Sequence, residues 1–156
     1  MAVYNLRNWL EKLNRKVHRS PKVVASKINY RWRWRGGIDW PYLFVETDFM
    51  IKTKANTILI EVDNSTGASA LSNVAKYTEL LSAKPLEFPK LVLIHILGPK
   101  FRGETQRNFI VYMELCKTLA HKLNMKYIQW QISNDGWNEF EFNRQVYGLL
   151  KNKHLI

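Results

Sequence analysis

Cysteine is almost absent from this sequence, and long apolar runs are missing altogether. Cys116 is the one cysteine among 156 residues, which excludes a disulfide within the chain and any zinc site made of several thiolates. No run of eighteen apolar residues occurs, and no GxxxxGK[ST] loop, so neither a membrane span nor a nucleoside-triphosphate motor is predicted. Because the first residues lack the apolar segment of a secretory signal, we expect a cytoplasmic protein with no membrane partner.

Acidic residues are also scarce, and the imbalance is concentrated at one end of the chain. Thirteen acidic residues stand against 24 basic ones, a net charge of +11. Residues 1–35 hold ten basic side chains and only Glu11, so this segment alone carries +9. Such asymmetry indicates a polyanionic partner, of which nucleic acid is the commonest. The residues expected to contact phosphates are Arg15, Lys16, Arg19, Lys22, Arg31, Arg33 and Arg35.

The spacing of apolar residues predicts a single α/β domain over residues 1–156, with a basic N-terminal helix and strand at about 1–37. Helices are predicted over residues 3–18, 69–83, 105–123 and 137–151. Strands are predicted over residues 30–35, 42–51, 57–63, 91–97 and 127–132. This order indicates a mixed sheet covered by helices on both sides. Cys116 has the helical spacing of a small core residue, and His95, within an apolar run, is expected to be a hydrogen-bonded core histidine.

Residues 30–35 alternate aromatic and arginine side chains without exception. As a strand, this segment would present three aromatic rings on one face and three guanidinium groups on the other. We interpret the arginines as contacts to phosphate. The aromatic residues are open to two interpretations, packing in the core or stacking on unpaired bases, and they are Tyr30, Trp32 and Trp34.

Four carboxylates follow on two neighbouring predicted strands. Alternation places Glu46 and Asp48 on one face of the first strand, and Glu61 and Asp63 on one face of the second. If the strands pair as a hairpin, the acids converge and their repulsion must be offset. A divalent cation, protonation of one acid, or ion pairs with basic groups such as Lys52 and Lys54 would each do so.

The order of these residues resembles the PD-(D/E)XK nuclease superfamily. An aspartate, Asp48, stands thirteen residues before an acid-x-residue triplet that begins at Glu61, and a helix with the adjacent residues Lys76 and Tyr77 comes next. The resemblance implies a restriction-endonuclease-like three-layer fold whose strand-hairpin-helix-strand core spans about residues 38–97. Residues 60–66 followed by Lys76-Tyr77 look most like the replication-relaxation proteins of plasmids and conjugative elements.

The resemblance implies a DNA endonuclease that uses Mg²⁺ or Mn²⁺ to hydrolyse phosphodiesters. Asp48 and Glu61 would hold the metal, and Glu46 or Asp63 would complete its ligands. Asp63 stands where the superfamily has its lysine. The catalytic set is therefore expected to be Asp48, Glu61, Asp63 and Lys76, with Lys52 and Lys54 as other sources of the cation.

Two other functions fit the same sequence. A non-catalytic DNA-binding accessory protein of plasmid replication or relaxation would keep the fold without the chemistry. An RNA-binding protein would use the same basic segment and aromatic residues. For a nuclease, cutting both strands of a duplex with one site per chain would favour a symmetric homodimer, whereas nicking would not need one.

Overall fold

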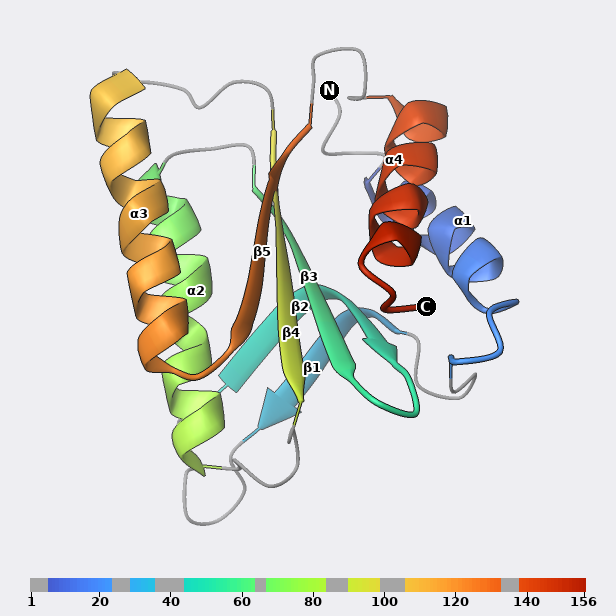
Figure 1. Cartoon of the computed structure of the whole chain (residues 1–156), viewed down its shortest axis with the longest axis horizontal. Helices are drawn as coiled ribbons and strands as arrows, with labels where there is room; N and C mark the ends of the chain where they lie inside the picture. The colour runs from blue at the N-terminus through green and yellow to red at the C-terminus, as the bar shows by residue number, and fades with distance from the viewer. Residues whose placement is uncertain are drawn as a thin grey trace.

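The computed structural model describes residues 6–23, 29–35, 44–63, 67–83, 90–98, 106–132 and 138–156, with residues 29–35 described by their backbone. The helices are α1 (Leu6–Val17), α2 (Gly67–Ala83), α3 (Gln106–Lys122) and α4 (Glu139–Asn152). The strands are β1 (Asn29–Arg35), β2 (Phe44–Lys52), β3 (Thr57–Asp63), β4 (Leu91–Leu97) and β5 (Lys126–Gln131). Figure 1 shows how they are arranged. None of the helices in the described part of the chain is both long and apolar enough to span a membrane.

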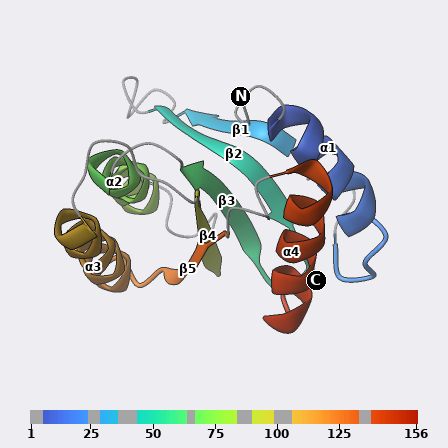
Figure 2. The same cartoon turned by 90° about the horizontal axis from the view of Figure 1, so that it is seen from above.

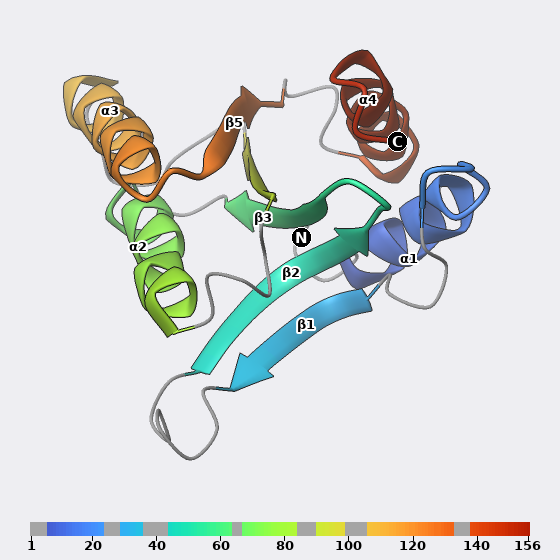
Figure 3. The same ribbon diagram turned by 60° about the horizontal axis from the view of Figure 1, so that its bottom comes forward.

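The five strands form one mixed sheet in the order β1-β2-β3-β4-β5. β2 runs antiparallel to both β1 and β3, whereas β3, β4 and β5 are parallel. Figure 3 shows that β1 and β2 form a curved ribbon at one side of the sheet. The predicted hairpin of the two acid-bearing strands is therefore confirmed, with Ile58 opposite Ile51 and Thr57 opposite Lys52.

Helices cover both faces of the sheet, which gives the three layers predicted from the sequence. α1 and α4 lie on one face, and α2 and α3 on the other (Figure 2). The sheet contributes Phe49, Ile60 and Ile94 to the core beneath α1 and α4. It contributes Leu59 and Leu93 to the core beneath α2 and α3. Because β3 and β4 are covered on both sides, each carries buried apolar side chains on both faces.

The helix α1 is amphipathic, and its apolar face is fixed against α4. Trp9, Leu10, Leu13 and Val17 are buried at helical spacing. The Trp9 and Phe142 rings pack with their centroids 5.4 Å apart. Burial of each such side chain contributes about 1.5–3 kcal/mol, so this apolar contact, rather than charge, holds the basic helix on the domain.

The predicted elements all occur among the described residues, with bounds that differ by a few residues. β3 and β4 have the predicted bounds, and α2 begins two residues earlier, at Gly67. Some residues of the predicted helices and strands lie outside the described residues, namely 3–5, 42, 43, 105 and 137. α3 ends where Asn124 takes a positive φ of 54°, a conformation that asparagine tolerates at helix ends. Cys116 is a buried core residue, as expected.

Candidate carboxylate site

The pairing of β2 with β3 brings Asp48 next to Glu61. Main-chain pairing of these strands runs from Lys52↔Thr57 to Phe49↔Ile60. Beyond this point, hydrogen bonds from side chains connect the two strands. The Asp48 Oδ2 atom accepts a hydrogen bond from the Val62 amide at 2.9 Å. Thr47 Oγ1 donates to the Ile60 carbonyl at 3.2 Å. The Asp48 carboxylate is thereby fixed against the strand that carries Glu61.

Glu61 is almost fully enclosed, with 3% of its surface exposed, the same fraction as for Asp63. Its Oε1 atom accepts a hydrogen bond from the Tyr77 hydroxyl. The Lys76 ammonium lies 2.6 Å from the same oxygen. Two adjacent residues of α2 therefore contact one carboxylate on β3, which places the helix directly over the acid pair.

Lys76 crosses from α2 to both acid-bearing strands. Besides the contact with Glu61, its Nζ atom donates to the main-chain carbonyl of Glu46 at 2.6 Å and to Asn73 Oδ1 at 3.4 Å. An ammonium has three hydrogens to donate, and these three oxygens match them. The cation is thus held at a defined place between β2 and β3.

Asp63 lies close to polar side chains from α2 and from β4, the strand that runs parallel to β3. Its Oδ2 atom accepts a hydrogen bond from Asn73 Nδ2 at 2.9 Å and lies 3.8 Å from His95 Nε2. His95 is fully buried, and its Nδ1 atom lies 2.9 Å from the Tyr127 hydroxyl. The expectation of a hydrogen-bonded core histidine is confirmed. Asn73 connects Asp63 with the Lys76–Glu61 pair, because its side-chain amide contacts both Asp63 and Lys76.

Burial shifts the pKa values of the two central acids upward. Loss of hydration raises the pKa of Asp48, helped by the charges of Asp63 and Glu46 and opposed by the Val62 amide and Lys76. Burial likewise raises the pKa of Glu61 to about 7, with Lys76 opposing the shift and Asp48 adding to it. One lysine therefore does not balance the carboxylates, and an additional positive charge would stabilise their ionised forms.

The donor set fits a hard divalent cation that is shared with a substrate. Within the residues that the structure describes, no three acidic, histidine or cysteine side chains converge closely enough to hold a metal ion. Mg²⁺ in proteins that act on phosphates is commonly held by one or two carboxylates, with waters and substrate oxygens as the other ligands. Asp48 and Glu61 supply such a pair. Glu46 contributes its carbonyl to Lys76, and Asp63 is oriented by Asn73.

The lysine near the acids comes from α2 and not from the hairpin turn. Lys52 and Lys54 are exposed at the turn. Lys52 follows Asp48 by four residues, which is about 13 Å along a strand. Of the three lysines considered from the sequence, the structure brings Lys76 to the carboxylates.

The predicted phosphate-contacting residues are divided between two regions. Arg15 and Lys16 are exposed on the last turn of α1, and Arg19 and Lys22 are exposed just after it. Arg31, Arg33 and Arg35 lie on β1, and the Arg33 backbone is opposite Glu46 on β2. The side chains of β1 lie outside the described part of the structure. The predicted faces of Tyr30, Trp32 and Trp34 therefore lie outside it as well.

Sequence reasoning missed the roles of Thr47 and Asn73 in the site, and it predicted His95 as a core residue without relating it to Asp63. Asn73 was detectable in principle, because it precedes Lys76 by three residues and so shares its face of the helix. The bond of Thr47 to β3 has no local signal, since it depends on where the two strands cease to pair.

Comparisons of the chain with protein-family models, with curated proteins and with solved structures gave no match.

Proposed function

We propose that this chain is a DNA endonuclease of the PD-(D/E)XK type that depends on Mg²⁺ or Mn²⁺ and has a restriction-endonuclease-like fold. One observation carries the proposal. The Lys76 ammonium lies 2.6 Å from Glu61 Oε1, and the Asp48 carboxylate accepts a hydrogen bond from the amide of Val62, the residue after Glu61. The closeness of these two acids and one lysine supports the proposal. The lysine comes from α2, in place of the triplet residue occupied by Asp63.

The order of the elements supports the same proposal. An antiparallel β2–β3 hairpin, then α2, then the parallel strand β4 is the core that the resemblance implies. Asp48 lies on the first strand of this core, Glu61 on the second and Lys76 on the helix that follows.

A divalent ion held by Asp48 and Glu61 would polarise a phosphodiester and lower the pKa of a bound water. The surrounding residues orient the carboxylates of Asp48 and Glu61. The Val62 amide fixes Asp48, and the Tyr77 hydroxyl fixes Glu61. Lys76 supplies a positive charge that stabilises negative charge on the phosphate as it develops. Preorganised donors of this kind contribute roughly 10²–10³ in rate each.

DNA would be held by the basic N-terminal region. Arg15, Lys16, Arg19 and Lys22 are exposed, and the β1 arginines lie on the strand next to β2. A role in the replication or relaxation of a plasmid or mobile element is the biological setting that the resemblance favours.

Digestion of supercoiled plasmid with Mg²⁺ or Mn²⁺ tests the proposal. We expect the natural protein to nick or cut the plasmid. We expect Asp48→Asn and Glu61→Gln to abolish cleavage while binding of the same DNA in chelator is retained, because both replacements keep the shape of the side chain and remove its charge.

Matched lysine variants test the role of Lys76. Lys76→Met is expected to slow cleavage by roughly 10²–10³, whereas Lys54→Met, at the exposed hairpin turn, should leave it unchanged. Equal effects of the two variants would contradict the assignment of Lys76.

The two alternatives give different results in the same experiments. A non-catalytic accessory protein would bind DNA with or without chelator and would not cut with any divalent metal. An RNA-binding protein would be displaced from duplex DNA by RNA of the same length. Cleavage that persists in Asp48→Asn would contradict the carboxylate site itself.

A further inference from the structure

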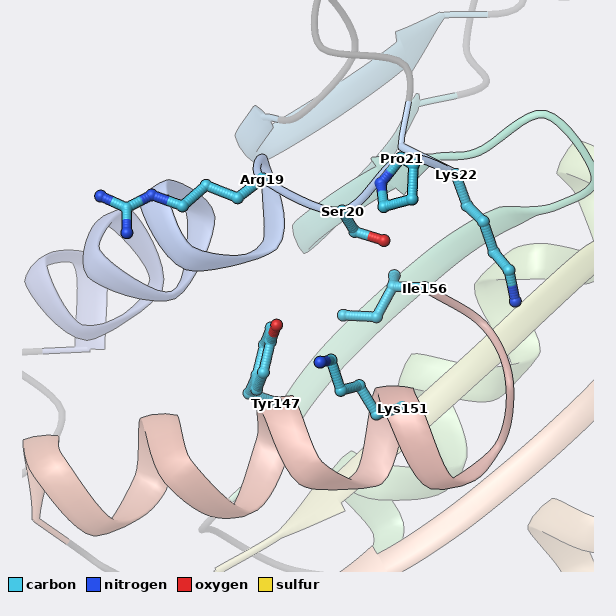
Figure 4. A pocket seen from close by; sticks show the side chains of 7 residues that line it. All are labelled: Arg19, Ser20, Pro21, Lys22, Tyr147, Lys151 and Ile156. Atoms are coloured by element: carbon cyan, nitrogen blue, oxygen red, sulfur yellow. The ribbon is translucent and has the colours of Figure 1, made fainter.

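A pocket of about 240 Å³ lies between the segment after α1 and the end of α4. Its lining residues are Arg19, Ser20, Pro21, Lys22, Tyr147, Lys151 and Ile156. Three of the seven are cations and none is acidic. Figure 4 shows the Lys151 ammonium beside the Tyr147 ring and the Ser20 hydroxyl directed toward the middle of the group.

Positive charge gathers at this pocket, and none of its seven lining residues has an acidic side chain. Lys16 and Lys151 both lie against the Tyr147 ring, at 4.9 Å and 5.0 Å from its centroid. The two ammonium groups are therefore within about 10 Å of each other, no more than the Debye length at 0.1 M salt. The electron-rich face of the ring attracts both cations, which holds them at this place despite their repulsion.

The acidic side chains of the same helical layer are paired elsewhere. They form the pairs Arg7–Glu11, Lys12–Glu139 and Arg144–Glu141. These pairs lie toward the beginning of α4 or on the outer face of α1, whereas the pocket lies at the ends of both helices. None of these described acidic side chains lines the pocket, so a bound anion there would face cationic and neutral side chains.

The size and donors of the pocket match a phosphate group. Each water takes about 30 Å³ of liquid volume, so the pocket has room for a phosphate with part of its hydration shell. Pockets that bind drug-sized ligands have volumes of about 300–1,000 Å³, larger than that of this pocket. The Lys151 ammonium and the Ser20 hydroxyl are donors to phosphate oxygens, whereas the Arg19 guanidinium is directed away from the group in Figure 4.

The pocket is separate from the carboxylate site. The segment that lines it is tied to the hairpin turn by the Val23↔Thr53 bridge and by the Lys54 amide, which donates to the Lys22 carbonyl at 3.1 Å. Asp48 precedes Thr53 by five residues, about 17 Å along the strand. A phosphate in the pocket is thus not the one that the carboxylates would contact.

We infer that this pocket binds one phosphate group of a nucleic-acid strand, as an anchoring contact separate from the carboxylate site. The choice of DNA as the source of the phosphate rests on the proposed function, whereas the affinity for phosphate does not.

Inorganic phosphate is the first probe, with NMR as the readout and chelator present. We expect saturable shifts of the Ser20, Tyr147 and Lys151 signals. These shifts should be lost in Lys151→Gln and weakened in Lys22→Gln. They should persist in Lys153→Gln, a matched control that removes one exposed charge from the same end of α4 without touching the pocket. Shifts spread over all basic residues, or equal behaviour of Lys151→Gln and Lys153→Gln, would overturn the inference.

Binding of a DNA duplex in chelator is the second probe. Each phosphate contact contributes about 0.9 to the slope of log affinity against log salt. Lys151→Gln should lower this slope by about one contact relative to Lys153→Gln. If phosphate binds while the DNA slopes of the two variants agree, the occupant is a free phosphate and the DNA contact is refuted. Neither assay involves cleavage, so failure of the nuclease proposal would leave both results interpretable.

Discussion

At the scale of single residues, the site is dominated by buried charge. Glu61 is almost fully enclosed, yet one lysine and one tyrosine hydroxyl contact its Oε1 atom. The Asp48 carboxylate loses hydration on burial and accepts a hydrogen bond from the Val62 amide. A buried ion pair rarely repays the cost of its desolvation in full. This arrangement therefore costs stability, which is the pattern expected where a protein maintains a reactive group.

The raised pKa of Glu61 predicts how the stability of the metal-free protein depends on pH. In the unfolded chain the carboxyl has its ordinary pKa of 4.5, and in the folded protein the value is about 7. Between these values the folded state binds more protons, so the free energy of unfolding falls as the pH rises from about 4.5 to 7. At about 1.36 kcal/mol per unit, the loss is about 3 kcal/mol.

Urea denaturation in chelator at pH 5 and pH 8 measures this dependence. Glu61→Gln has no proton to lose and should show a flatter response than the natural protein, while other titrating groups contribute equally to both. The same fall in stability for both proteins would contradict the assignment of the shift to Glu61.

At the scale of elements, two helices bring polar side chains to the two sites considered for this domain. α2 carries Asn73, Lys76 and Tyr77 on the face toward the acids, and so provides the cation that β3 lacks. α4 carries Tyr147 and Lys151 to the phosphate pocket. The chemistry proposed for this protein thus depends on two helices on opposite faces of one sheet.

The side chain of Asn138 caps the first turn of α4, and its contribution to stability can be measured. Asn138 precedes the helix with extended backbone angles, and its side chain accepts a hydrogen bond from the Glu141 amide at 3.0 Å. Asn138→Ala should lower the free energy of unfolding by about 1 kcal/mol, because the amide loses its cap. Asn152→Ala, at the exposed last residue of the same helix, is the control and should be near neutral. Equal urea midpoints for the two variants would show that the cap contributes nothing.

At the scale of the whole molecule, charge is distributed unevenly. Most of the net charge of +11 comes from residues 1–35. The cations on α1 and just after it lie in the layer of α1 and α4, on the face of the sheet away from α2. A chain with this distribution is suited to hold a polyanion over a large area rather than through a single ion pair.

This distribution predicts a steep salt dependence of DNA binding. With six to ten phosphate contacts, affinity for duplex DNA should fall by roughly 10³–10⁵ between 50 and 200 mM salt. Fluorescence anisotropy of a labelled duplex in chelator measures it, with an RNA duplex of the same length as competitor. A flat response to salt would refute the role of the basic N-terminal region.

Much of the fold and part of the candidate site were predictable. Apolar spacing predicted β3 and β4 with their observed bounds, and alternation of acids predicted that Asp48 and Glu61 would converge. The partner of Glu61 was left open among three lysines. The pocket between the ends of α1 and α4 was not predicted at all, since its walls are more than a hundred residues apart in sequence.

The sequence by itself determined the elements, their order and the concentration of positive charge, because periodicity and composition act over a few neighbouring residues. Only the tertiary structure decided which groups meet. Lys76 reaches a carbonyl thirty residues earlier, and Lys22 donates to the His154 carbonyl at the other end of the chain. Such contacts depend on how helices pack across the sheet, and packing is a property of all the apolar surfaces together.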